Sequence, residues 1–219
     1  HPGYNLIKNY VTSAVPVYKA MKIKNCIALN KSAKDTAASI NKFVKESKNI
    51  FKNYAIVTRG AGNRLPKLKK LRNWILLADM PVEKAIGKLT GMKILKKTND
   101  YRNDAEIILE LAKKHNVYVQ IKGPDSFGHK NKPLEKKKII EKIDREFFSV
   151  IKKSKGMIIV TSDHSTPCKL KAHSKDPVPV LVYGRGKDRV NKFSESDCRK
   201  GSLGSFNGLK LMKIIDKEQ

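Results

Sequence analysis

The sequence lacks the features that would place a chain in a membrane or in an oxidising compartment. No uninterrupted apolar stretch approaches the ~20 residues of a membrane-spanning helix, and residues 1–10 contain no apolar signal-peptide region. Cysteine is scarce: Cys26, Cys168 and Cys198 are odd in number, widely spaced and form no CxxC pair. We therefore expect a cytoplasmic protein in a reducing environment, without a disulfide framework or a cysteine-based zinc site.

Acidic residues are also few, because 20 Asp and Glu stand against 47 Lys and Arg, for a net charge of +27. Such a charge attracts nucleic acid, anionic membranes or phosphorylated small molecules. The lysines are spread along the whole chain without interleaved aromatic residues or a nucleic-acid-binding motif. We interpret them as a solvated surface, keep non-specific nucleic-acid binding as the alternative, and expect no membrane partner.

With 219 residues and 40% hydrophobic residues, the chain can form one ordinary domain with a core, or one domain and a smaller appendage. Its apolar patterns predict alternating strands and helices. The predicted strands are 10–18, 24–30, 54–58, 73–78, 92–96, 117–122, 157–161 and 178–183. The predicted helices are 32–53, 79–91 capped by Asp79, 103–116 opened by Asn103 or Asp104, 133–154, and a last one around 209–215. This alternation indicates a predominantly parallel α/β sheet, in which ligands bind at the carboxyl ends of the strands.

Carboxylates and imidazoles follow two of these predicted strands. Asp125 and His129 lie on the predicted loop after strand 117–122, and Asp163 and His164 come directly after the next strand, which we expect to be parallel to it. His173 follows in the next loop. Such a mixture suits Mn²⁺ or Zn²⁺ better than Ca²⁺.

These five residues form two candidate ligand sets. The first is Asp125, His129 and His173, and the second is Asp163 with His164. Two ions about 3.5–4 Å apart would form the clamp that is used for phosphoryl transfer. The sequence therefore predicts a site for an anionic, phosphorylated substrate.

A glycine-rich loop, RGAGNRLP (59–66), follows the predicted strand 54–58. Such a loop can approach an anion closely, and Arg59 and Arg64 would supply forked hydrogen-bond donors. Taken alone, the motif does not distinguish a binding loop from an ordinary turn.

Three segments carry a resemblance to a known family: PDSFGH (124–129), TSDHSTPCKLKAHSKDPVPVLVYG (161–184) and the RGAGNRLP loop. They are similar to the archaeal-type cofactor-independent (2,3-bisphosphoglycerate-independent) phosphoglycerate mutases of the alkaline phosphatase superfamily. The resemblance implies a three-layer, mostly parallel α/β sheet. It assigns residues 66–219 to the second half of the metal-binding core, and 1–65 to the end of an inserted α/β cap domain.

The resemblance also implies an activity, the interconversion of 3- and 2-phosphoglycerate in glycolysis and gluconeogenesis through a phosphoserine enzyme. Asp125, His129 and His173 would hold one divalent metal, and Asp163 and His164 would contribute to the other. Mn²⁺ is expected, with Zn²⁺ or Mg²⁺ as alternatives. Arg59 and Arg64 would contact the phosphoglycerate.

The sequence departs from the family pattern because it resembles only the C-terminal portion, without the motifs of the first half. The Asp-Gly metal motif and the motif of the nucleophilic serine are not found, and Ser162 and Ser165 do not stand in that motif. We therefore assign no catalytic residue in this chain, and expect a complementary N-terminal chain or segment without which it is inactive. The segment Thr98–Asn103 also replaces a longer loop of the family.

Two alternatives remain open at this point. One is a non-catalytic basic protein of this fold that binds RNA or another polyanion. The other is a different metal-dependent phosphatase or phosphomutase of the same superfamily.

Overall fold

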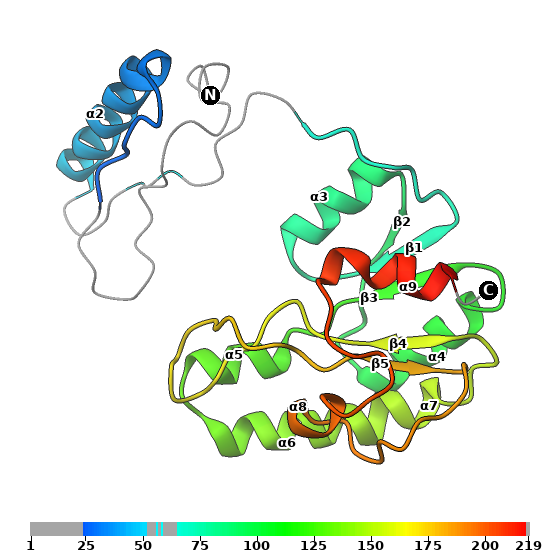
Figure 1. The fold of residues 1–219 in the computed structure, drawn as a ribbon. Helices are drawn as coiled ribbons and strands as arrows, with labels where there is room; N and C mark the ends of the chain where they lie inside the picture. Colours follow the sequence, from blue (N-terminus) through cyan, green and yellow to red (C-terminus); the bar gives the residue numbers. More distant parts are fainter. Residues whose placement is uncertain (1–23, 52–55, 57, 59–64, 218–219) are drawn as a thin grey trace. The chain divides into compact units, whose positions relative to one another are not determined.

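A computed structural model describes residues 24–51, 56, 58 and 65–217 (Figure 1). The chain divides into two compact units, His1–Leu68 and Lys69–Gln219, which are treated separately below. Arg59, Arg64, the predicted strand 10–18 and most of the predicted strand 54–58 lie outside the described residues. The interpretation of the two units as cap and core stays a prediction.

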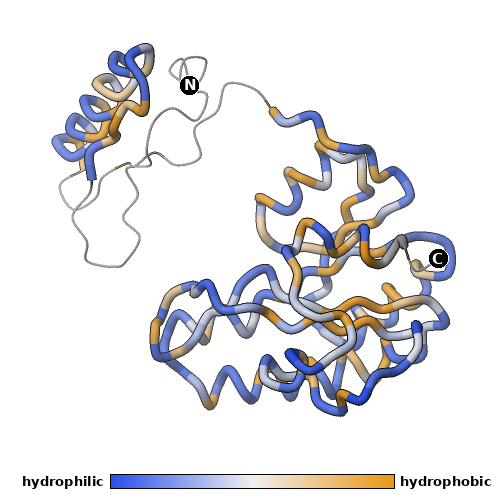
Figure 2. Tube along the Cα trace, in the orientation of Figure 1, coloured by the Kyte–Doolittle hydropathy of each residue, from blue (hydrophilic) through white to orange (hydrophobic). Residues whose placement is uncertain are grey.

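The described part of the first unit is a helix with one apolar side. A short turn, η1 (Lys31–Ala33), leads into α2 (Lys34–Ile50), and Asn30 caps the turn by accepting from the Ala33 N–H at 3.1 Å. Figure 2 shows apolar residues along one side of α2; its buried apolar residues are Ala37, Ile40 and Val44. The predicted helix 32–53 is thereby confirmed as far as Ile50, and residues 52 and 53 lie outside the described residues.

The predicted strand 24–30 is wrong, because these residues form an irregular segment with an isolated bridge. The Asn41 side chain accepts from the Cys26 N–H at 2.7 Å and donates to the Cys26 carbonyl at 3.0 Å. An asparagine of α2 thus takes the backbone groups that a neighbouring strand would have used.

The second unit contains a parallel sheet whose central strand is β1 (Trp74–Leu77). Strand β2 (Lys93–Leu95) pairs on one side and β3 (Asn116–Val119) on the other, so that the order is β2-β1-β3. Three consecutive residues of β1 are buried, as expected for a parallel strand covered on both faces. The parallel sheet predicted from the alternation of strands and helices is confirmed.

Helices cover both faces of this sheet (Figure 1). On one face α3 (Pro81–Thr90) approaches so closely that a Cβ on Gly87 would lie 2.6 Å from Cδ2 of Leu76. On the other face lie α4 (Tyr101–Leu111) and the continuous helix formed by α6 (Pro133–Ile143), the π-turn η2 (Asp144–Phe148) and α7 (Ser149–Ile151). The core between this helical layer and the sheet contains Ile75, Leu77, Ala105, Ile108, Ile143, Phe147, Val150 and Ile151. The three layers confirm the predicted architecture.

Two predicted helix caps are wrong. Met80, not Asp79, is the N-cap of α3, and the Asp79 carboxylate instead accepts from Lys97 Nζ at 2.8 Å. Asp100 caps α4 by accepting from the Asn103 N–H at 2.7 Å. Asp104 is buried within α4, and accepts from the backbone N–H and the hydroxyl of Thr98. In both cases a nearby polar partner overrides the local preference of aspartate for a cap.

A second, two-stranded sheet follows the long helix in the sequence. Strand β4 (Ile158–Val160) pairs with β5 (Leu181–Tyr183) in the antiparallel direction. These ladders place β4 in a separate sheet and not beside β3, so the prediction that strand 157–161 continues the sheet of its predecessor is wrong for the described residues. Its direction relative to β3 stays a prediction. An apolar run of three residues carries no information about the direction of its partner.

The remaining elements are short helices. They are α5 (Gly123–His129), α8 (Glu195–Cys198), η3 (Gly208–Lys210) and α9 (Leu211–Lys217), the last of which confirms the predicted C-terminal helix. Within the described part of the chain, none of the helices combines the length and apolarity that crossing a bilayer requires.

Candidate metal centre

Asp125 and His129 lie on helix α5, not on a loop as predicted. Pro124 occupies the first turn of this helix, where its missing N–H costs no hydrogen bond. The four-residue spacing places both side chains on one face of the helix. His129 Nε2 accordingly lies 3.4 Å from Asp125 Oδ1.

The segment between β4 and β5 supplies the other three candidate ligands. It folds back on itself at Ser165 and Ser174, whose bridge includes a hydrogen bond from the Ser174 N–H to the Ser165 carbonyl at 3.1 Å. This return brings the rings of His164 and His173 into a stack, with centroids 3.4 Å apart. His164 and His173, nine positions apart in the sequence, are therefore neighbours in the candidate metal site. We call residues 161–177 the ligand loop.

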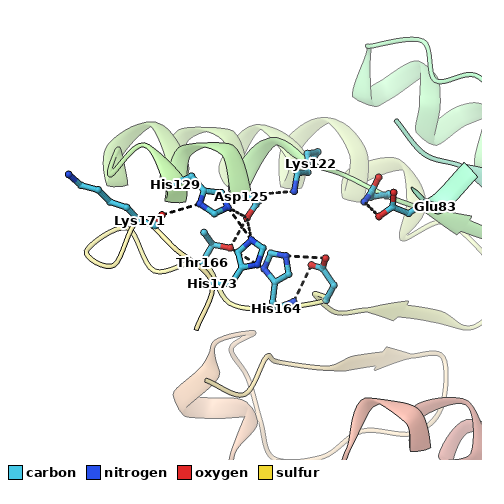
Figure 3. Close-up of polar contacts among 10 residues, drawn as sticks. Glu83, Lys122, Asp125, His129, His164, Thr166, Lys171 and His173 are labelled. Carbon is cyan, nitrogen blue, oxygen red and sulfur yellow. Dashed lines mark hydrogen bonds and ion pairs between the residues drawn. The ribbon is translucent and has the colours of Figure 1, made fainter. Parts of the chain in front are cut away.

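Helix α5 and the ligand loop meet in one cluster (Figure 3). His173 Nε2 lies 3.0 Å from His129 Nε2 and 3.7 Å from Asp125 Oδ1. Asp125, His164 and His173 also offer ligand atoms that all lie within 4.8 Å of one another. The two predicted ligand sets are thus not separate in space, because His173 and Asp125 are neighbours of both.

Asp163 lies at the rim of this cluster. Its Oδ2 is 3.2 Å from His164 Nε2, and its side chain is 75% exposed. The structure therefore brings all five predicted residues together, with Asp163 as the most accessible.

The hydrogen bonds of His129 fix which of its ring nitrogens carries the proton. Its Nδ1 lies 3.1 Å from the carbonyl oxygen of Lys171, which can only accept. Nδ1 is therefore protonated, and in the neutral ring the lone pair is on Nε2. This lone pair faces Asp125 Oδ1, another acceptor, and the His173 ring.

His164 is oriented in the same way by Thr166. The Thr166 hydroxyl gives its one proton to Asp125 Oδ1 at 2.6 Å, so it must accept from His164 Nδ1 at 3.1 Å. The lone pair of neutral His164 is then on Nε2, which faces the Asp163 carboxylate.

These tautomers leave ring nitrogens and carboxylate oxygens pointing at one another with too few protons between them. A divalent cation satisfies such a set of converging acceptors, and outer carbonyl and hydroxyl partners of this kind typically orient metal-bound histidines. The residues present therefore fit a divalent metal.

Two pKa values in the cluster are consistent with metal-ligating forms. Burial alone would raise the pKa of Asp125, but hydrogen bonds from Lys122 and Thr166, and the positive charge of Lys122, outweigh it and lower the pKa. Burial and then the neighbouring His164 lower the pKa of His173. Near neutral pH both effects favour an ionised carboxylate and a neutral imidazole, the forms that bind metals.

Sequence reasoning missed three contributors to this site. They are the Thr166 hydroxyl, the Lys122 ammonium in contact with Asp125 Oδ2, and the Lys171 carbonyl. Lys171 has a φ of 53°, an uncommon conformation for a residue other than glycine. Of these three groups, only the Thr166 hydroxyl could have been identified from the sequence, because Thr166 follows Asp163 and His164 closely.

A second polar cluster lies at the carboxyl ends of the parallel strands, beyond Lys122 in Figure 3. Gln120 Nε2 donates to Glu83 Oε1 at 2.7 Å, and Lys97 Nζ donates to the Gln120 carbonyl at 3.1 Å. The strand ends are thus tied together by side chains at the edge of the sheet that faces the start of α5.

Comparison with known proteins defines the class of this chain. Residues 75–217, which include the sheet, α5 and the ligand loop, match the family described as the Metalloenzyme superfamily. The chain belongs to this superfamily, which implies that it binds divalent metal. The mixed α/β fold with a parallel sheet is accordingly of the alkaline-phosphatase-like metalloenzyme type, as the sequence predicted.

The more specific relatives are phosphoglycerate mutases. The chain is 35% identical over 217 residues to a "2,3-bisphosphoglycerate-independent phosphoglycerate mutase" of Picrophilus torridus, and 32% identical over 210 residues to that of Methanoculleus marisnigri. These alignments cover 85% and 82% of this chain, and 54% and 51% of the relatives. The resemblance inferred from the motifs is confirmed, and the chain spans about half the length of the curated relatives it matches.

Two solved structures resemble this chain in fold. The PH0037 protein from Pyrococcus horikoshii has a TM-score of 0.70 at 26% identity, over 86% of this chain and 58% of the other. A cofactor-independent phosphoglycerate mutase from Thermoplasma acidophilum has a TM-score of 0.57 at 22% identity, over 97% and 59%. At this identity the latter shows a shared fold.

Proposed function

We propose that this chain is the metal-binding part of a phosphoglycerate mutase that interconverts 3- and 2-phosphoglycerate in glycolysis and gluconeogenesis. The observation that carries the proposal is the convergence of Asp125, His129, Asp163, His164 and His173. Outer partners leave the Nε2 lone pairs of His129 and His164 pointing toward this cluster. The similarity to named phosphoglycerate mutases supports the substrate.

In this proposal Asp125, His129 and His173 hold one divalent ion, and Asp163 and His164 contribute to a second. Mn²⁺ is the expected metal, with Zn²⁺ or Mg²⁺ as alternatives, because the ligand set mixes carboxylates with imidazoles. Bound there, the ions would neutralise charge on the transferred phosphoryl group. Arg59 and Arg64 are proposed to contact the substrate.

The chain's own residues prepare the site for an anion. Lys122 keeps Asp125 ionised, and its ammonium group is only partly exposed beside the cluster. It is placed to offset the charge of a phosphorylated ligand. The Lys171 carbonyl and the Thr166 hydroxyl hold the imidazoles of His129 and His164 in the orientation that directs Nε2 toward the site.

The nucleophile is proposed to be a serine of a complementary segment, and the chain alone is proposed to be inactive. Two observations support this proposal: residues 1–219 do not contain the motif of the nucleophilic serine, and the chain aligns with only about half of its relatives. The transferred phosphoryl group would reside on that serine while the glycerate reorients.

Metal titration of the purified chain tests the first half of the proposal. We expect Mn²⁺ binding by calorimetry in the wild type, and its loss in Asp125→Asn. Asp35→Asn, an exposed change in the first turn of α2 in the other unit, is the matched control and should bind as the wild type does. Equal binding by Asp125→Asn and the control would sink the metal assignment.

A coupled assay with the complementary segment supplied in trans or by fusion tests the second half. Mutase activity that requires both parts supports the proposal. Hydrolysis of phosphate esters without mutase activity would instead favour a phosphatase of the same superfamily.

A second candidate function rests on the net charge of +27. A polyanion-binding protein should retain RNA with an affinity that falls steeply with salt, because bound counterions are released. Filter binding to RNA between 50 and 200 mM salt distinguishes a polyanion-binding protein from one whose lysines only form a solvated surface. Over this interval, a protein that makes about six to ten phosphate contacts loses roughly 10³–10⁵ in affinity.

A further inference from the structure

Thr166 is the one hydroxyl that joins helix α5 to the ligand loop in the hydrogen bonds described for the cluster. Its residue surface is only 5% exposed. Its Oγ1 donates to Asp125 Oδ1 at 2.6 Å and lies 3.1 Å from His164 Nδ1. A single side chain therefore contacts one member of each predicted ligand set, as the dashed lines in Figure 3 show.

The backbone of Thr166 is held from two sides. Lys136 Nζ donates to its carbonyl oxygen at 2.9 Å. Gly128, on α5 between Asp125 and His129, packs against it so closely that a Cβ there would lie 2.5 Å from this oxygen and 2.9 Å from Cγ2. Only a glycine at 128 lets α5 approach Thr166 to the distance at which the hydroxyl reaches Asp125.

The hydroxyl has one proton, and its two partners therefore depend on each other. Because the proton goes to the carboxylate, the oxygen can only accept from His164, which fixes the tautomer of that ring. If the hydroxyl turned away, Asp125 would lose a donor and His164 Nδ1 would lose its acceptor at the same time.

We propose that Thr166 is a positioning residue that couples the two sets of metal ligands. It orients the Asp125 carboxylate and selects the His164 tautomer whose Nε2 is free for a metal. The inference rests on the metal centre of the proposed function, and goes beyond it by assigning a specific role to a residue outside the ligand sets. Partners of this kind typically change metal affinity by about 10–100-fold when they are replaced.

Packing of the Thr166 methyl group against Gly128 is the competing role, and two substitutions separate it from hydrogen bonding. Thr166→Val keeps the shape and removes the hydroxyl, whereas Thr166→Ser keeps the hydroxyl and removes the methyl. In calorimetric Mn²⁺ titrations of the full chain, we expect Thr166→Val to weaken binding about 10–100-fold, and Thr166→Ser to bind within about threefold of the wild type. The inference is overturned if Thr166→Val also binds within threefold of the wild type, or if the serine variant is the weaker one.

Gly128→Ala provides a second route that leaves the hydroxyl in the chain. Its added Cβ must displace the Thr166 backbone, so we expect weakened Mn²⁺ binding again, with thermal unfolding followed in the same samples. Wild-type affinity in this variant would contradict the inference. Should Thr166→Val fail to fold, the Mn²⁺ affinity of Gly128→Ala still tests the role of Thr166.

The ¹⁵N chemical shifts of the histidine rings in metal-free protein give a readout that does not depend on the metal. We expect the His164 ring of the wild type to be protonated on Nδ1, and Thr166→Val to convert it to a mixture of tautomers. The His129 ring, which is held by the Lys171 carbonyl, should not change. Identical His164 shifts in both proteins would overturn the role of Thr166.

These experiments distinguish failure of the inference from failure of the proposed function. A wild-type chain that binds no Mn²⁺, Zn²⁺ or Mg²⁺ defeats the proposed function, while the ring shifts still decide whether Thr166 selects the His164 tautomer. If the wild type binds metal and Thr166→Val binds it equally tightly, the inference about Thr166 fails and the proposed function stands.

Discussion

The parallel sheet β2-β1-β3 and the ligand loop differ in what holds them together. The sheet is covered by helices on both faces, and Leu77 of its central strand is 1% exposed. The ligand loop contains a single β-bridge, and the His173 side chain that it carries is 49% exposed. Apolar burial therefore stabilises the fold in one region, whereas converging polar groups prepare a binding site in the other.

This difference implies that folding stability and metal affinity can be changed separately. Substitutions in the sheet should unfold the chain, while substitutions in the ligand loop should leave it folded and unable to bind. Each of the following predictions tests that separation.

Leu77→Ala should have the largest effect on stability. Removing a fully buried leucine costs about 2–5 kcal/mol, through lost burial and the remaining cavity. Urea unfolding followed by the fluorescence of Trp74, the only tryptophan of the chain and part of β1, measures this loss. Leu170→Ala in the ligand loop is the control, because Leu170 is 57% exposed and should cost less than about 0.5 kcal/mol. Equal losses in the two variants would remove the distinction between the regions.

His173→Ala should have the largest effect on binding. It removes the ring that lies between His129 and His164, and we expect Mn²⁺ affinity to fall by more than the ~10–100-fold typical of an outer partner. The unfolding free energy of the metal-free chain should change by less than about 0.5 kcal/mol, because the side chain is half exposed. His115→Ala, whose ring contacts Asn73 outside the cluster, is the control for removing an imidazole. A large drop in metal-free stability would mean that the histidine cluster is structural.

Gly91→Ala should have a smaller effect, confined to the sheet region. Gly91 ends α3 with a φ of 76°, and its N–H bonds to the carbonyls of Gly87 and Lys88. Alanine in this left-handed conformation should cost about 1 kcal/mol. Mn²⁺ affinity should stay unchanged, since the ligand loop does not depend on this turn. A loss of affinity larger than the loss of stability would show that α3 and the site are coupled.

The sequence predicted the regular elements well, because amphipathic spacing and buried apolar runs leave a direct trace in the residue order. The strand 73–78, the helix 133–154 and the parallel sheet follow from such patterns, whereas the three layers are what the family resemblance implies. The types and order of the candidate ligands also indicated a metal site before any geometry was known, because Asp and His followed two apolar runs.

The features that the sequence did not reveal depend on tertiary contacts. GPDSFGH contains glycine and proline, which predict a loop, although proline in the first turn is compatible with helix α5. The pairing of β4 with β5 in a separate sheet cannot be predicted from a short apolar run, because such a run does not identify its partner strand. The roles of Thr166 and of the Lys171 carbonyl arise only when α5 and the ligand loop meet.

Asp188→Asn should have the smallest effect, and its dependence on pH identifies its origin. Asp188 accepts from the backbone N–H groups of Ser202 and Val190, which lower its pKa below the ordinary 3.8. A carboxylate whose pKa is lowered by folding stabilises the folded chain above its unfolded pKa, and this stabilisation is lost as the pH falls through its lower folded value. The wild type should therefore be slightly more stable than Asp188→Asn at pH 7, and the difference should shrink as the pH falls below about 3.8.

Melting curves of the metal-free proteins between pH 7 and pH 3 would show this convergence, and a constant gap would instead mean that the asparagine disturbs packing. Asp188 lies in a segment without regular structure and outside the metal cluster, so we expect Asp188→Asn to leave Mn²⁺ affinity at neutral pH unchanged. That result would show that an irregular backbone alone does not place a residue in the metal site.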